Sequence, residues 1–232
     1  MKVILFGATG MVGQGVLREC LLDPGVARVL VIGRRTTGQG HAKLRELLLD
    51  DLFKVPTLGS ELDGYDACFY CLGVSAMGMT EEAYRLVTFD LTMVVARSLV
   101  ARNPAMTFVY VSGTGTDSSG KGRVMWARVK GITEDAVSAL PFRATFMFRP
   151  GYIQPMHGMK SSTGWYRVIY TGVMGPLYPL LSAVLPHYVT TTELVGRAMI
   201  EVAEHGAPVP VLENREINEV ARARGRTVQS KE

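Results

Sequence analysis

The chain has 232 residues, enough for one well-filled domain and too few for two full ones. Apolar residues make up 47% of the sequence and charged residues 20%, a balance that excludes a disordered chain and is typical of a globular α/β protein. The net charge is +4, but Lys and Arg are interspersed with acidic residues, so we expect no nucleic-acid partner.

Short apolar runs bounded by turn residues alternate with longer segments of helical period. In chain order, the predicted strands are Lys2–Phe6, Val29–Ile32, Leu44–Leu49, Ala67–Cys71, Thr107–Val111, Thr145–Phe148 and Val209–Leu212. The predicted helices are Gly10–Leu22, Glu81–Arg102, Trp126–Leu140 and Thr192–Glu204. This alternation predicts an α/β fold with a doubly wound parallel sheet covered by helices on both faces.

The regular alternation ends after Pro150, where the sequence becomes rich in Gly, Pro and Met. We expect a small C-terminal cap there, so residues 1–150 form the core and residues 151–232 form a cap or substrate lobe plus the final strand and helices, in one compact domain. The apolar segment Val168–Val189 approaches membrane-spanning length, but Gly and Pro interrupt it, so we expect a buried or lid segment rather than a spanning helix, with peripheral membrane contact as the alternative. The charged tail Glu213–Glu232 is either a docked helix or a frayed end.

The N-terminal apolar stretch is too short for a secretory signal, and the three cysteines fit a reducing compartment, so we expect a cytoplasmic protein. Cys68 and Cys71 have CxxC spacing, but residues i and i+3 of a strand point to opposite faces, which disfavours a disulfide. The sequence has no HExxH, no GxSxG and no spaced Cys/His set, so it predicts no metal site and no serine hydrolase.

A glycine loop follows the first predicted strand directly. Gly7 allows a sharp turn, Gly10 lets backbone N–H groups approach a diphosphate, and Gly13 lets the next helix pack tightly on the strand. Phosphates would lie at the helix N-terminus, where unpaired N–H groups favour negative charge. The loop therefore predicts a dinucleotide site in a Rossmann fold, and the alternative is a turn needed only for packing. The predicted loop residues are Gly7, Ala8, Thr9, Gly10, Met11, Val12 and Gly13.

The second predicted strand is followed by Gly33, Arg34 and Arg35, where an NAD site would usually carry an acidic residue. Guanidinium groups suit a 2′-phosphate by charge and by forked hydrogen bonding, so the sequence favours NADP(H) over NAD(H). The alternative is that one or both are solvated surface arginines. Asp50 and Asp51 follow the third predicted strand. The carboxylate of one of them accepts a hydrogen bond from the adenine amino group; the alternative is an ordinary surface acid.

These motifs, taken together, give the chain a resemblance to the short-chain dehydrogenase/reductase superfamily. It looks most similar to the atypical, epimerase-like branch that includes NADP-binding tumour suppressor proteins and NmrA-like sensors. The resemblance covers about residues 1–155 and implies that Leu72 and Gly73 lie under the nicotinamide-side ribose, with Pro150 and Gly151 beside the nicotinamide. The matching segments are Gly7–Gly13, Gly33-Arg34-Arg35, Cys71-Leu72-Gly73, Val111-Ser112-Gly113-Thr114 and Arg149-Pro150-Gly151.

Members of that superfamily carry a catalytic Tyr four residues before a Lys, together with a Ser or Thr after the fifth strand. Lys130 matches the lysine, but Trp126 stands at the tyrosine position. An indole N–H cannot exchange a proton near neutral pH as a tyrosine with a lowered pKa does. The resemblance implies that Lys130 binds the nicotinamide ribose and that Ser112 or Thr114 donates a hydrogen bond to a substrate oxygen.

Three residues could replace the missing tyrosine as proton donor. Lys130 could act if burial lowers its pKa, and Tyr152 or His157 could act because each follows the Pro150-Gly151 turn. The alternatives are a packing role for Tyr152 and a solvated His157. We expect either a reductase or epimerase-like enzyme acting on a small carbonyl or conjugated substrate, or a catalytically weak NADP(H) sensor with a regulatory protein partner; the oligomeric state stays open.

Overall fold

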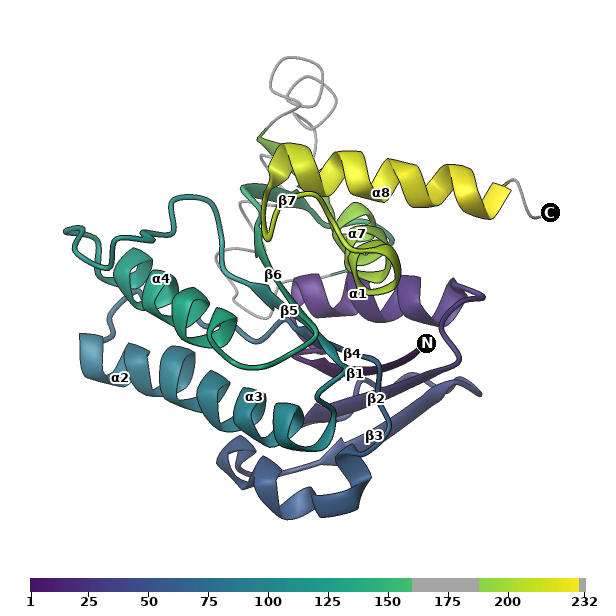
Figure 1. The fold of residues 1–232 in the computed structure, drawn as a ribbon, viewed down its shortest axis with the longest axis horizontal. Coiled ribbons are helices and arrows are strands. Elements are labelled where there is room, and N and C mark those ends of the chain that lie inside the picture. Colours follow the sequence, from purple (N-terminus) through teal and green to yellow (C-terminus); the bar gives the residue numbers. More distant parts are fainter. Residues whose placement is uncertain (160–187, 230–232) are drawn as a thin grey trace.

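The computed structural model of the chain describes residues 1–159 and 188–229, and the main sheet within it has seven strands in the order β3-β2-β1-β4-β5-β6-β9 (Figure 1). Every neighbouring pair in this sheet is parallel. The strands are β1 Lys2–Phe6, β2 Arg28–Gly33, β3 Leu44–Leu48, β4 Ala67–Tyr70, β5 Thr107–Val111, β6 Ala144–Arg149 and β9 Val211–Glu213. A separate parallel pair joins β7 Tyr152–Gln154 to β8 Val189–Thr191.

Helices cover both faces of the sheet, as the doubly wound pattern predicts (Figure 1). The α1, α7 and α8 helices pack with one another and share one apolar core with the sheet, whereas η1, α3 and α4 enclose the core on the other face. The α/β Rossmann fold expected from the sequence is therefore confirmed. The helical elements are α1 Met11–Leu22, η1 Leu52–Leu62, α2 Glu81–Arg85, η2 Leu86–Asp90, α3 Leu91–Arg102, α4 Met125–Ser138, α7 Thr192–His205 and α8 Asn214–Gln229.

Two stretches of helix differ from the prediction. The expected single helix 81–102 is interrupted by η2, which has π-helical hydrogen bonding. Periodicity cannot reveal such a turn, because one wider turn leaves the apolar spacing on either side intact. The 3-10 segment η1 was not predicted, since Pro56 and Gly59 interrupt any regular helical period.

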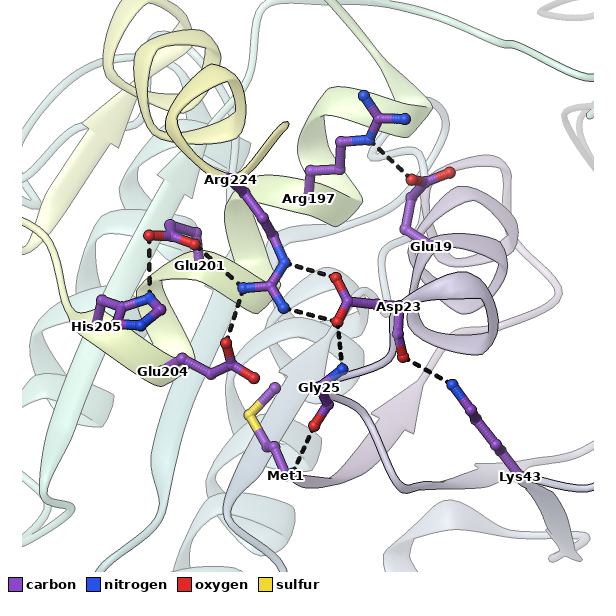
Figure 2. A network of polar contacts seen from close by, with 10 residues as sticks. All are labelled: Met1, Glu19, Asp23, Gly25, Lys43, Arg197, Glu201, Glu204, His205 and Arg224. Carbon is purple, nitrogen blue, oxygen red and sulfur yellow. Dashed lines mark hydrogen bonds and ion pairs between the residues drawn. The ribbon is translucent and has the colours of Figure 1, made fainter. Parts of the chain in front are cut away.

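The charged tail is a docked helix rather than a frayed end. Figure 2 shows Arg224 of α8 lying between Asp23, at the end of α1, and two carboxylates of α7, Glu201 and Glu204. The distances from its guanidinium nitrogens to these three partners are 2.6, 3.1 and 2.8 Å, in that order. Because Asp23 and Arg224 are 201 residues apart, these ion pairs join helices that are distant in the sequence.

The expected cap and the apolar segment Val168–Val189 lie largely at residues 160–187, outside the described residues. Within the parts that are described, 1–159 and 188–229, no helix combines the length and the apolar character that a membrane span requires.

Candidate functional site

A cavity of about 390 Å³ lies at the carboxyl ends of β1, β2 and β4. In this sheet the connection from β1 runs to β2 on one side, whereas the connection from the adjacent β4 runs to β5 on the other side. Ligands of open parallel sheets bind at such a switch point. Nine of the residues predicted to bind the cofactor line the cavity: Gly7, Thr9, Gly10, Arg34, Arg35, Asp51, Cys71, Leu72 and Gly73. Ala8 and Gly33 line a smaller cavity, which shares Arg34, Arg35 and Leu72 with the first.

The glycine turn is fixed by close backbone contacts. Gly7 has a φ of 80°, and a Cβ atom there would lie 2.6 Å from the backbone of Cys71. A Cβ at Gly13 would lie closer than 3.0 Å to the Gly7 backbone, so α1 packs on the end of β1 as predicted. A Cβ at Gly10 would meet only the Gly7 carbonyl, at 3.3 Å. The turn therefore has close backbone contacts at Gly7 and Gly13, and it faces the cavity at Gly10.

The N-terminus of α1 is electrostatically suited to an anion. The N-cap is Gly10, which has no side chain to cap the first turn, and that turn contains no acidic residue. Met11, Val12 and Gly13 of the first turn are not among the residues that line the cavity. The first turn of a helix has unpaired backbone N–H groups at the positive end of the helix dipole, which favour an anion.

The charged groups around the cavity differ in whether they have protein partners. Arg34 and Arg35 are exposed, and their side chains form no hydrogen bond or ion pair within the described residues. Asp50 pairs with Lys54 at 3.0 Å. The Asp51 carboxylate accepts a hydrogen bond of 3.0 Å from the backbone N–H of Phe53 and caps η1. The cavity rim therefore carries two unpaired positive charges beside two acids that already have donors.

A second polar group lies beyond the carboxyl ends of β5 and β6. The Lys130 ammonium donates to the backbone carbonyl of Ser112, and burial lowers the pKa of Lys130 to about 8, against the opposing effect of Glu134. The buried Ser112 hydroxyl donates to Glu134. The Thr114 hydroxyl is exposed and donates to the Arg149 carbonyl at 3.0 Å. Of the two hydroxyls, Thr114 is thus the one accessible to a substrate.

Glu134 was not among the predicted site residues, although it is central to this group. Its carboxylate pairs with the Arg149 guanidinium, and their side chains are 4% and 12% exposed, respectively. The sequence holds a partial signal, because Glu134 follows Lys130 by one helical turn and so lies on the same face of α4. Its pairing with Arg149, 15 residues away on β6, requires the tertiary structure.

Of the remaining predicted residues, Pro150 and Gly151 lie beside Thr114 of this second group. Thr114 N–H donates to the Pro150 carbonyl at 3.0 Å, and Gly151 N–H donates to the side chain of Asn214 at 2.9 Å. The Tyr152 hydroxyl donates to Gln154 at 2.6 Å. His157 lies 3.1 Å from Glu193, so it has a partner rather than being only solvated. None of these residues lines the cavity at the glycine turn.

The cysteines of the CxxC segment lie on opposite sides of the sheet. Cys68 belongs to the core on the η1 and α3 face, and Cys71 packs against the core on the α1 face. Burial raises the pKa of both thiols, which keeps them protonated and poorly reactive. Across the described ranges, no group of three or more His, Cys, Asp or Glu side chains is arranged to hold a metal ion.

No protein-family profile matches the chain, but several fungal proteins are similar to it in sequence. "Protein fmp52, mitochondrial" of Emericella nidulans is 29% identical over 206 residues, which cover 86% of this chain and 85% of that protein. A protein of the same name from Aspergillus clavatus is 36% identical over 163 residues, which cover 66% of each chain.

These relatives contradict the expectation of a cytoplasmic protein, because their names place them in mitochondria. The cytoplasmic prediction is therefore wrong. It depended on the short N-terminal apolar stretch and on the cysteine content. The first excludes only a secretory signal and the second is common to all reducing compartments, so neither distinguishes the cytoplasm from an organelle.

Solved structures share the fold at low sequence identity. The Bordetella bronchiseptica enzyme WbmF, in complex with NAD⁺, superposes with a TM-score of 0.65 at 15% identity, covering 97% of this chain and 77% of its own. ADP-L-glycero-D-manno-heptose-6-epimerase of Helicobacter pylori gives 0.64 at 14%, covering 96% and 81%. An oxidoreductase of the short-chain dehydrogenase/reductase family from Burkholderia thailandensis gives 0.61 at 14%, covering 87% and 84%. The chain therefore shares the Rossmann fold of these enzymes.

Proposed function

We propose that the chain binds NADP(H) at the glycine turn, in preference to NAD(H). The observation that carries this proposal is the cavity at the ends of β1, β2 and β4, whose rim holds Arg34 and Arg35 without partners among the described residues. A 2′-phosphate presents the oxygens that forked guanidinium donors bind. A Cβ at Gly73 would meet nothing within 4 Å, and Gly73 and Gly10 both line the cavity, so the backbone at Gly73 leaves room for the cofactor.

The proposed reaction is the reduction, or an epimerase-like interconversion, of a small carbonyl or conjugated substrate. When bound, the cofactor would supply or accept the hydride. Lys130 is the proposed proton donor, because its lowered pKa of about 8 keeps both ammonium and amine accessible near neutral pH. Thr114 is proposed to donate a hydrogen bond to the substrate oxygen, since its hydroxyl is exposed whereas that of Ser112 is buried against Glu134.

The second candidate is an NADP(H)-responsive regulatory protein with little turnover. The observation that favours it is the internal hydrogen bonding of the predicted catalytic donors. Lys130 donates to Ser112, and the Ser112 and Thr114 hydroxyls donate to Glu134 and Arg149. A substrate must displace or share these bonds, and Trp126 supplies no titrating proton in place of the usual tyrosine.

The cofactor proposal predicts a marked difference between two titrations. NADPH and NADH are added separately to the purified full chain while tryptophan fluorescence is followed, with Trp126→Phe as the control that assigns the signal. We expect tighter binding of NADPH. Equal or tighter binding of NADH would contradict the assignment of Arg34 and Arg35 to a 2′-phosphate.

Turnover distinguishes the two candidate functions. NADPH oxidation is measured with a panel of quinones, enones and aldehydes, using the natural sequence, Lys130→Ala and Trp126→Tyr. The enzyme proposal predicts activity that Lys130→Ala lowers by about 100-fold, the usual contribution of a general acid. A natural sequence that is inert with the whole panel, together with a Trp126→Tyr variant that turns over, supports the regulatory candidate.

A further inference from the structure

The loop that carries Arg34 and Arg35 is tied to the neighbouring strand through one carboxylate. The chain continues from Arg35 into Thr36 and Thr37, and Glu46 lies on β3 beside them. The Thr36 hydroxyl donates to Glu46 Oε2 at 2.6 Å, while the Thr37 hydroxyl and backbone N–H donate to Oε1 at 2.6 and 2.8 Å. Both carboxylate oxygens are therefore occupied by the two residues that follow the arginines.

The hydroxyl hydrogens are directed toward Glu46 by the loop itself. The Thr36 hydroxyl accepts from the backbone N–H of Gly38 at 3.1 Å, and the Thr37 hydroxyl accepts from that of Gln39 at 3.3 Å. Each hydroxyl thus uses its oxygen for a local turn and its hydrogen for the carboxylate. Partial burial raises the pKa of Glu46, but these hydrogen bonds outweigh that effect and leave the pKa below its usual value. Hydrogen bonds to an ionised acceptor are stronger than neutral ones.

The same contacts explain why the arginines stay unpaired. Three acids lie near them in the sequence or the cavity, and each already has a donor: Glu46 has the threonines, Asp50 has Lys54, and Asp51 has the N–H of Phe53. Glu46 does not line the cavity, whereas Arg34 and Arg35 do. Glu46 therefore contacts the loop without occupying the cavity rim.

We propose that Glu46 fixes the loop that presents Arg34 and Arg35 and thereby determines the preference for a nucleotide carrying a 2′-phosphate. This inference rests on the proposed function, because it concerns the same cavity. Glu46 is a positioning residue: it holds Thr36 and Thr37, and these fix the backbone that carries the two arginines before the ligand arrives. Ordering a loop in advance lowers the entropy cost of binding.

The test compares Glu46→Ala with Glu61→Ala in titrations of the full chain with NADPH and NADH. Glu46→Ala releases the loop, so we expect the Kd for NADPH to rise about tenfold while the Kd for NADH changes less than about twofold. Glu61→Ala removes an equal charge near β3, where Glu61 pairs with Arg45, but Glu61 neither binds Thr36 or Thr37 nor lines the cavity, so this variant should leave NADPH binding unchanged. Glu46→Gln keeps one acceptor oxygen and should lose less affinity than Glu46→Ala.

If Glu46 acts by position, only Glu46→Ala weakens NADPH binding; if Glu46 acts only by its charge, neither variant weakens it. NADPH binding in Glu46→Ala that is unchanged or tighter, beside tight binding by the natural sequence, overturns the role of Glu46 alone. A natural sequence that binds neither nucleotide overturns the proposed function and this role together. The backbone N–H of Thr37 donates to Glu46, so its hydrogen exchange, measured without nucleotide, should be faster in Glu46→Ala. Unchanged exchange would contradict the claim that Glu46 fixes the loop.

Discussion

Arg224 and the pair Arg34 and Arg35 have opposite surroundings within one chain. Arg224 is buried in α8 and its guanidinium meets three carboxylates (Figure 2). Arg34 and Arg35 follow β2, are exposed at a cavity rim and have no partner in the described part of the chain. A guanidinium saturated by acids joins elements of the fold, whereas one kept from every acid has its charge available for a ligand.

Lys130 lies between these two extremes. It is partly buried and donates to a backbone carbonyl, with Glu134 one helical turn away as the nearby opposite charge. This environment neither saturates the ammonium nor leaves it in water, and burial makes its charge state sensitive to pH. The three settings predict three different effects of substitution: on stability, on ligand affinity and on pH dependence.

The largest effect is expected at Arg224. Replacing Arg224 by Met leaves Asp23, Glu201 and Glu204 close together without their shared cation, and breaking a buried ion pair in this way costs about 3–5 kcal/mol of unfolding free energy. Urea denaturation measures it, with exposed Arg222→Met of the same helix as the control, expected within about 0.5 kcal/mol of the natural sequence. Equal losses of unfolding free energy in the two variants would contradict this role of Arg224, because the loss would then not depend on its ion pairs.

An effect on affinity rather than on stability is expected at the cavity rim. Replacing both Arg34 and Arg35 by Ala removes the forked donors, and a hydrogen bond to a charged group contributes about 1.5–3 kcal/mol, so NADPH should bind about 10- to 100-fold more weakly. The unfolding free energy should change by less than about 0.5 kcal/mol. Isothermal titration and urea denaturation measure the two quantities. A variant that loses stability but keeps its NADPH affinity would show that these arginines stabilise the fold, as Arg224 does, and do not bind the ligand.

The smallest expected effect is the pH dependence of the reaction rate that Lys130 produces. Donating a proton to a carbonyl oxygen requires the ammonium form, which is lost as pH rises through the pKa of about 8. The rate of carbonyl reduction should therefore be level below that pH and fall about tenfold per unit above it, while alcohol oxidation should rise with pH. Lys130→Arg keeps the charge but does not titrate, so its residual rate should not follow this profile. A natural sequence whose rate is flat through alkaline pH excludes Lys130 as the proton donor.

Local patterns were sufficient to predict most of the sheet and the residues at its carboxyl edge. The first strand was predicted with its observed bounds, and the glycine turn, Arg34, Arg35 and Leu72 do meet at one cavity. This succeeded because parallel strands place their carboxyl ends at the same edge, so residues that follow different strands become neighbours. Of the predicted catalytic set, Lys130, Ser112 and Thr114 lie in a second polar group instead, and the catalytic roles remain predictions.

The sequence by itself determined which segments form the main sheet, which glycines form the turn and where the usual tyrosine is absent, since each depends on residue type and on spacing within one element. Only the tertiary structure decided partners: Glu134 with Arg149, Glu46 with the threonines after the arginines, and Arg224 with an acid 201 residues away. The physical reason is that periodicity specifies the face on which a side chain lies, whereas its partner depends on which elements the crossover connections bring together.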